Sequence, residues 1–224
     1  MSDYYLKYIK YKTKYLQLHE ISQLRGKNKH LVIHISGPSG SGKSTLGNKL
    51  KEKFGNKIVV KDIDELQAEF QKNEYGFDEV KKIDAKKYQK WIDNYVNEQK
   101  KPLIFVGLNH MPWWDKKLYY DMHADYKFYI KLDIDIIFRQ KCDRWLTGTF
   151  VDNKENLFKI IIENEKKIIK DIQEEFKSEC SHKETKRMTD MWNRDYKNQG
   201  YKFMSHENIF TEVSKIIKNN ELSI

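Results

Sequence analysis

The sequence predicts a three-layer α/β fold, in which helices cover both faces of a five-stranded, mainly parallel β-sheet. Short apolar runs of strand length alternate with longer amphipathic stretches of helical period along most of the chain. This alternation is typical of parallel sheets with helical crossovers. The length of 224 residues suits one such domain and is short for two.

The strands and helices can be placed in order along the chain. The predicted strands are 31–35, 57–62, 102–106, 126–132 and 201–204. The predicted helices are 44–54, 65–70, 84–98, 133–145, 153–178, 183–197 and 207–218. Because ligands bind at the carboxyl ends of the strands in such sheets, the residues after each strand are the first candidates for a site.

The first 28 residues are expected to form an amphipathic helix and a linker in front of the domain at 29–224. Within 3–25, aromatic and apolar side chains recur every three or four residues and would form one stripe of a helix, with lysines on much of the remaining surface. The residues of this stripe are Tyr4, Tyr8, Tyr11, Tyr15 and Leu18. The stripe is expected to pack on its own domain or on a second copy, which would give a homodimer. The alternative is a basic, aromatic surface for nucleic acid or membrane headgroups.

The composition indicates a cytoplasmic protein of a reducing compartment. The two cysteines, Cys142 and Cys180, match no metal-ligand spacing and no disulfide framework. No apolar run approaches the roughly 20 residues of a membrane span, and no signal peptide is expected. The net charge of +9 comes mostly from lysine. It reflects either codon bias on solvated faces or a surface for polyanions.

A glycine-rich motif follows the first predicted strand and precedes a predicted helix. It matches G-x-x-x-x-G-K-[ST] completely. Its glycines let successive N–H groups turn toward an anion, and the helix start adds a positive dipole end. Lys43 is expected to bridge the β- and γ-phosphates of ATP, Ser44 to ligate Mg²⁺, and Thr45 to support the helix start or the α-phosphate. The predicted ATP site comprises Gly37, Pro38, Ser39, Gly40, Ser41, Gly42, Lys43, Ser44 and Thr45.

Two aspartates, Asp62 and Asp64, follow the second predicted strand. If the strand continues to residue 64, both side chains point to the same side, because side chains alternate with period two. One carboxylate then organises Mg²⁺, and the other orients or deprotonates an acceptor hydroxyl. The alternative role for either aspartate is the N-cap of the following helix.

The run Gly-Ser-Gly-Lys-Ser-Thr-Leu-Gly at 40–47, followed by Asp-x-Asp at 62–64, resembles shikimate kinase and its gluconate- and nucleotide-kinase relatives. The resemblance implies a P-loop fold with sheet order 2-3-1-4-5, in which Asp62 supports Mg²⁺ and Asp64 contacts the acceptor hydroxyl. It covers mainly 30–66 and, more loosely, 102–146. The shikimate enzymes carry three glycines after the third strand, whereas this chain has Gly-Leu-Asn from residue 107, so shikimate itself is not the expected acceptor.

Three residues after the third predicted strand are candidates for binding the acceptor. Asn109 and His110 lie near the end of the strand, three and four residues after it. His110 either binds the acceptor or a phosphate, or is a structural loop histidine. Trp113 either stacks on a ring or packs as a loop anchor.

Two arginines are predicted on the helix at 133–145. Arginine occurs at only five positions in the chain, which draws attention to Arg139 and Arg144. In the resembling kinases this region supplies an adenine-contacting arginine and leads into a mobile lid. Both arginines are therefore predicted to be catalytic, with Arg144 also binding the nucleotide, and the alternative is surface pairing. Residues 147–198 are predicted to be a helical lid that excludes water.

The motifs together predict an ATP- and Mg²⁺-dependent kinase that acts on a small hydroxylated metabolite, a nucleoside or a nucleotide. Two alternatives remain open at this point. A 5′-polynucleotide or RNA-end kinase would use the same loop and would give the lysines a purpose. A non-enzymatic, ATP-dependent interaction module could assemble through residues 3–25.

Overall fold

A computed structural model describes residues 30–76, 83–110, 119–146, 174, 177 and 180–221. Its five strands are β1 (Val32–Ser36), β2 (Val59–Asp62), β3 (Leu103–Val106), β4 (Tyr126–Ile130) and β5 (Lys202–Met204). The α-helices within this part are α2 (Lys43–Phe54), α3 (Ile63–Tyr75), α4 (Ala85–Glu98), α5 (Ile134–Leu146), α7 (His182–Asn198) and α8 (His206–Glu221).

The strands form one open, parallel sheet in the order β2-β3-β1-β4-β5. This arrangement confirms the predicted α/β class and the predicted strand order. The predicted helices 3–25 and 153–178 lie mostly or wholly outside the described residues, as does Trp113. Of the predicted lid at 147–198, α7 is the part that the structure describes as a continuous helix.

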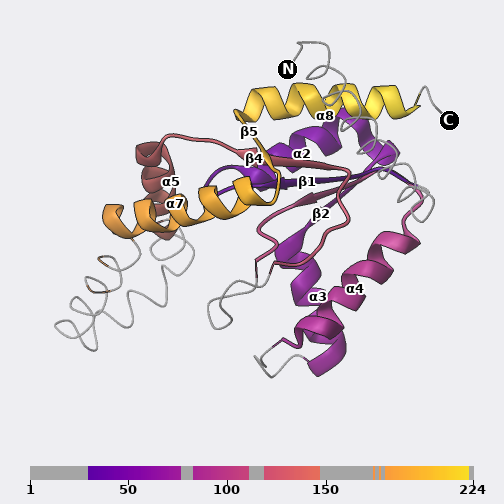
Figure 1. Cartoon of the computed structure of the whole chain (residues 1–224), viewed down its shortest axis with the longest axis horizontal. Helices are drawn as coiled ribbons and strands as arrows, with labels where there is room; N and C mark the ends of the chain where they lie inside the picture. Colours follow the sequence, from indigo (N-terminus) through magenta and orange to yellow (C-terminus); the bar gives the residue numbers. More distant parts are fainter. Residues whose placement is uncertain are drawn as a thin grey trace, which may run out of the picture.

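One layer of the fold consists of α2 and α8, which cover the same face of the sheet (Figure 1). Side chains alternate across a strand, and on β1 the residues Ile33 and Ile35 point toward this layer. They pack with Leu46 and Leu50 of α2 and with Val213 of α8, all fully buried. The alternating apolar side chains of the strands and the apolar faces of the two helices therefore pack together in one core.

The opposite face of the sheet is covered by α3 and α4 over β1 and β3, and by α7 toward β4 (Figure 1). Val32 of β1 and Phe105 of β3 point to this side and pack with Leu66 of α3 and Ile92 of α4. Strands that are buried on both faces read as continuous apolar runs. All four residues of β3 are accordingly buried.

Side-chain caps begin three of the helices on this second face. The Asp84 carboxylate accepts hydrogen bonds from Lys86 N and Lys87 N at the start of α4. Ser181 caps α7, and Asp62 caps α3. Each cap satisfies backbone N–H groups that have no partner within the helix, so these polar residues determine where the helices begin.

Within the stretches that the structure describes, no helix combines the length and the apolar character needed to cross a lipid bilayer.

Candidate active site

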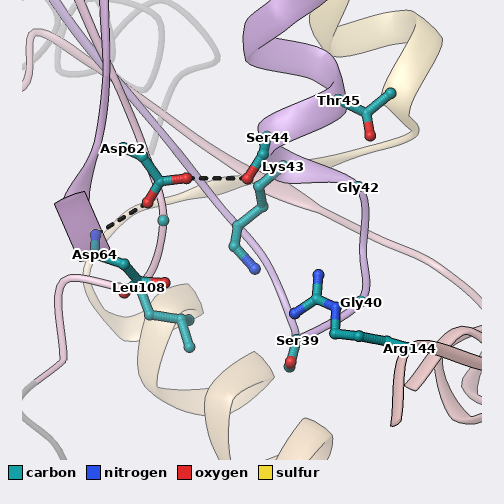
Figure 2. A pocket seen from close by; sticks show the side chains of 11 residues that line it. Ser39, Gly40, Gly42, Lys43, Ser44, Thr45, Asp62, Asp64, Leu108 and Arg144 are labelled. Carbon is teal, nitrogen blue, oxygen red and sulfur yellow. Dashed lines mark hydrogen bonds between the residues drawn. The ribbon is translucent and has the colours of Figure 1, made fainter. Parts of the chain in front are cut away.

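A hollow lies where β1 passes into α2, at the carboxyl ends of β1, β2 and β3 (Figure 2). The glycine-rich loop supplies one wall, the ends of β2 and β3 supply another, and α5 contributes a single side chain. The residues that line the hollow are Ser39, Gly40, Gly42, Lys43, Ser44, Thr45, Asp62, Asp64, Gly107, Leu108 and Arg144. Six positions of the predicted loop, both predicted aspartates and one predicted arginine thus meet in one place.

Lys43 opens α2 and is held by the loop that precedes it. Its Nζ donates hydrogen bonds to Gly37 O at 3.0 Å and to Pro38 O at 2.8 Å. Gly42 precedes the helix with a φ of 80°, a conformation that favours glycine. Burial lowers the pKa of Lys43 to about 8, an effect that Asp64 and Asp62 oppose and Arg144 reinforces. The lysine therefore carries its charge at neutral pH in a partly desolvated position.

Gly37, Pro38 and Ser41 belong to the predicted loop but do not line the hollow. The first two present carbonyl groups to Lys43. Ser41 is buried, and its backbone N–H donates a hydrogen bond of 3.1 Å to Pro38 O, which closes a turn. These three residues therefore hold the conformation of the loop without lining the hollow themselves.

Ser44 and Asp62 join the start of α2 to the end of β2. Ser44 Oγ donates to Asp62 Oδ2 at 3.0 Å, and Asp62 Oδ1 accepts from Asp64 N at 3.0 Å (Figure 2). Asp62 is thus the N-cap of α3, the alternative role considered from the sequence, and it also faces the hollow.

Asp64 reaches the hollow by a route that strand alternation did not predict. The strand β2 ends at Asp62, and α3 begins at Ile63, so the period-two argument for residues 62 and 64 is wrong. Asp64 instead lies in the first turn of α3 and still lines the hollow. Burial raises the pKa of its carboxyl group, and Asp62 raises it further, while Lys43 and Arg144 oppose the rise. A carboxylate with a raised pKa is a stronger base than an ordinary aspartate.

The two predicted arginines of α5 have different surroundings. Arg144 lines the hollow (Figure 2) and contributes a positive charge that acts on both Lys43 and Asp64. Arg139 is exposed and is not among the lining residues. The helix passes close to the loop, since a Cβ on Gly40 would lie 3.5 Å from the backbone N of residue 141.

Asn109 and His110 lie beside the hollow without lining it. Asn109 is buried, its Nδ2 donates to Tyr120 O at 2.7 Å, and its Oδ1 accepts from Tyr196 Oη at 2.8 Å. His110 forms a β-bridge with Tyr119 and packs its ring edge-on against the tyrosine ring. The structure gives both residues partners within the chain, and neither of them lines the hollow.

Three residues at or near the hollow were not predicted as site residues. Gly107 and Leu108 directly follow β3 and line the hollow, and their place at the carboxyl end of a parallel strand could have suggested them. His206 begins α8, and its Nε2 donates to Gly42 O at 2.9 Å. No signal in the sequence connects residue 206 with the loop, because the two meet only through the tertiary fold.

The donor groups present fit a magnesium ion. Mg²⁺ prefers hard oxygen ligands and commonly takes one or two from the protein, with phosphate oxygens and water completing the shell. Ser44 and Asp62 place a hydroxyl and a carboxylate oxygen side by side on the hollow. Among the described residues no cluster of three or more His, Cys, Asp or Glu side chains could hold a metal. A magnesium ion that took its remaining ligands from phosphate and water would not need such a cluster.

The fold and the loop define an open, three-layer α/β protein whose architecture is compatible with the P-loop fold. No protein-family model matches the chain, and no curated protein matches it. Among solved structures, an uncharacterized protein from Eubacterium ventriosum is similar at 13% identity, with 84% of this chain and 98% of that chain covered and a TM-score of 0.43. At that score we draw no conclusion about function from the likeness.

Proposed function

We propose that the protein is a phosphotransferase that moves the γ-phosphoryl group of ATP, with Mg²⁺, to the hydroxyl group of a small metabolite, nucleoside or nucleotide. One observation carries the proposal. A half-buried lysine, a hydroxyl–carboxylate pair and a second carboxylate with a raised pKa converge on the hollow beside a glycine-rich loop.

The phosphate chain is bound by the loop and by two cations. Backbone N–H groups of the loop and the N-terminus of α2 favour an anion. Lys43 from α2 and Arg144 from α5 both add positive charge to the hollow (Figure 2). These groups stabilise the charge on the transferring oxygens, which is the main catalytic requirement of phosphoryl transfer.

Ser44 and Asp62 are the residues that would hold Mg²⁺ in this site. When bound, the ion neutralises charge on the phosphate oxygens and orients them. The Asp62 carboxylate also accepts the Asp64 backbone N–H. It therefore couples the position of the metal-binding oxygen to that of the first turn of α3.

Asp64 acts as the proton acceptor. The hydroxyl group of the phosphoryl acceptor gives its proton to the Asp64 carboxylate. The oxygen of that hydroxyl group then forms the new bond to the γ-phosphorus. The bond between that phosphorus and the bridging oxygen breaks, and its electron pair remains on ADP. The raised pKa of Asp64 supports this role, because the shift makes the carboxylate a stronger base than an ordinary aspartate.

The decisive experiment measures ATP consumption over a panel of sugars, hydroxy acids, nucleosides, nucleoside monophosphates and 5′-hydroxyl oligonucleotides, with calorimetry of Mg–ATP binding alongside. We expect binding and turnover of a small acceptor. Arg144→Ala should weaken both, whereas the matched variant Arg139→Ala, on the same helix but away from the hollow, should not.

Two results would contradict the proposal. The absence of binding heat for Mg–ATP would exclude a nucleotide site. Turnover confined to oligonucleotides, with affinity that falls steeply as salt is added, would instead indicate a nucleic-acid end kinase.

A further inference from the structure

His34 is a fully buried histidine in the middle of β1, three residues before the glycine-rich loop begins at Gly37. Both of its ring nitrogens have a partner. Nδ1 lies 2.5 Å from Tyr201 Oη, and Nε2 lies 3.1 Å from Gly107 O. One of these partners, Gly107, lines the hollow, so the histidine connects the core of the sheet to the wall of the candidate active site.

The partners determine which ring nitrogen carries the proton. A carbonyl oxygen only accepts, so Nε2 donates to Gly107 O, and in a neutral ring Nδ1 then accepts from the Tyr201 hydroxyl. Burial lowers the pKa of His34 to about 4, with Lys127 and Lys43 adding to this and the Gly107 bond opposing it. Burial also raises the pKa of Tyr201. At neutral pH the ring is therefore uncharged, and the tyrosine keeps its donor proton.

Gly107 is held to β1 at both of its backbone polar groups. Its N–H donates to Ile35 O at 3.1 Å, while its carbonyl accepts from His34. Its φ of 140° is one that favours glycine, and a Cβ here would come within 2.9 Å of Ile63 Cβ. The orientation of the next peptide group is consequently fixed from the sheet.

The orientation of the Gly107 carbonyl decides where the Leu108 N–H points. In a trans peptide the C=O of one residue and the N–H of the next point in opposite directions, and the described chain contains no cis peptide. The carbonyl is directed into the core at His34, so the Leu108 N–H is directed away from it. Leu108 itself lines the hollow beside Asp64 (Figure 2). Among the described residues, its N–H donates no hydrogen bond within the chain.

We propose that His34 is a positioning residue, which turns the Gly107–Leu108 peptide so that the Leu108 N–H serves as a donor to an anionic oxygen of the transferring phosphoryl group. This inference rests on the proposed function. A fixed N–H donor costs no reorganisation when negative charge develops at the reacting phosphate, which is why such donors lower barriers.

The sequence allows this peptide to be observed alone. The dipeptide Gly-Leu occurs once in the chain, at 107–108. Labelling glycine with carbonyl ¹³C and leucine with ¹⁵N therefore gives one carbonyl-filtered amide signal in the full-length protein. We expect that signal to shift when Mg²⁺ and the non-hydrolysable β,γ-imido analogue of ATP are added, and to shift far less with Mg–ADP, which lacks the γ-phosphoryl group.

Two variants of His34 separate the hydrogen bond from the packing. His34→Gln retains an amide N–H that can donate to Gly107 O, whereas His34→Leu fills the space without a donor. We expect His34→Leu to lose the γ-phosphate-dependent shift and about 10²-fold in kcat with little change in the KM for ATP, a loss typical of removing one such donor. His34→Gln should recover most of both.

The ring tautomer tests the anchor without any ligand. A ¹⁵N histidine spectrum of the wild-type protein should show His34 neutral with its proton on Nε2, and a proton on Nδ1 would overturn the inference. So would binding of the analogue, seen by calorimetry, with an unmoved Leu108 signal, or a His34→Leu variant with full kcat. The absence of binding heat for both nucleotides would overturn this inference together with the proposed function.

Discussion

Lys43 and Asp64 face the same hollow with opposite charges, yet burial shifts the pKa of each toward its neutral form. Each side chain partly restores the charge of the other, because Asp64 raises the pKa of Lys43 and Lys43 lowers that of Asp64. Groups with shifted pKa values that converge in a hollow are typical of functional sites. Burial in the hollow therefore disfavours the charged forms of Lys43 and Asp64, although the proposed function needs these charges.

Replacing Lys43 separates these two effects. Lys43→Met should weaken Mg–ATP binding by roughly 10- to 150-fold, the equivalent of a charged hydrogen bond worth about 1.5–3 kcal/mol. The same variant should unfold at or above the wild-type temperature, because a desolvated charge is removed. The folded pKa near 8 lies below the unfolded value of 10.5, so wild-type stability should rise between pH 8 and pH 10.5. Calorimetry measures the loss of Mg–ATP affinity, and thermal unfolding at a series of pH values measures the stability. We expect the wild type to gain stability between pH 8 and pH 10.5 and the variant not to gain it.

Asp64 is expected to act in the chemical step and not in nucleotide binding. Asp64→Asn should lower kcat by about 10²–10⁴, the usual contribution of a general base, and should leave the Kd for Mg–ATP almost unchanged. The wild-type kcat should rise with pH through the raised pKa of Asp64, and the variant should lose that limb. Weakened nucleotide binding with an unchanged pH profile would contradict the assignment.

At the scale of elements, α7 is joined to the segments around the end of β3 by specific side chains. Tyr196 Oη donates to Asn109 Oδ1 at 2.8 Å, and Tyr119 Oη donates to Asp195 Oδ2 at the same distance. At its other end α7 contacts α5, where His182 bonds Asp135 at 2.8 Å. Because α5 carries Arg144 and β3 leads into Leu108, α7 supports both walls of the hollow.

Two buried tyrosines on this face give a matched pair of variants. Tyr196→Phe removes the donor to the buried Asn109 amide oxygen and should lower the free energy of unfolding by about 1–3 kcal/mol. Tyr129→Phe removes a buried hydroxyl that has no hydrogen-bond partner within the described residues, and it should leave stability unchanged or slightly raised. Denaturant unfolding measures both variants. Equal losses would show that the Tyr196–Asn109 bond contributes nothing of its own.

At the scale of the whole molecule, the sheet buries a histidine that must be neutral in the folded state. The folded pKa of His34, about 4, lies below the ordinary 6.5, so between these values the unfolded chain binds more protons than the folded one. Stability should consequently fall as pH is lowered from 6.5 toward 4, by an amount on the order of 3 kcal/mol. The charged or titratable groups that act on the ring are Lys127, Lys43 and Tyr201. Unfolding at a series of pH values should show this slope in the wild type and a smaller one in His34→Gln.

The fold class and most of the elements could be predicted from the sequence alone, and the strand order could be predicted from the resemblance of its motifs to those of the P-loop kinases. Strands and helices differ in the period at which apolar residues recur, and this period is a local signal in the chain. The glycine-rich loop is a contiguous motif that needs a particular strand-to-helix turn. For the same reason Lys43, Ser44 and Asp62 could be assigned to one place before the structure was known. Parallel topology then brings the ends of neighbouring strands together whatever the rest of the chain does.

Only the tertiary structure decided the contacts that depend on distant segments. Strand alternation could not place Asp64, because the cap at Asp62 ends the strand two residues early. The hydrogen-bond partner of Asn109 is Tyr196 of α7, which lies 87 residues away in sequence. His34 reads as one polar residue in an apolar strand, and its bonds to Gly107 and Tyr201 span 73 and 167 residues. Such partners are chosen by packing in three dimensions, which no local pattern in the chain encodes.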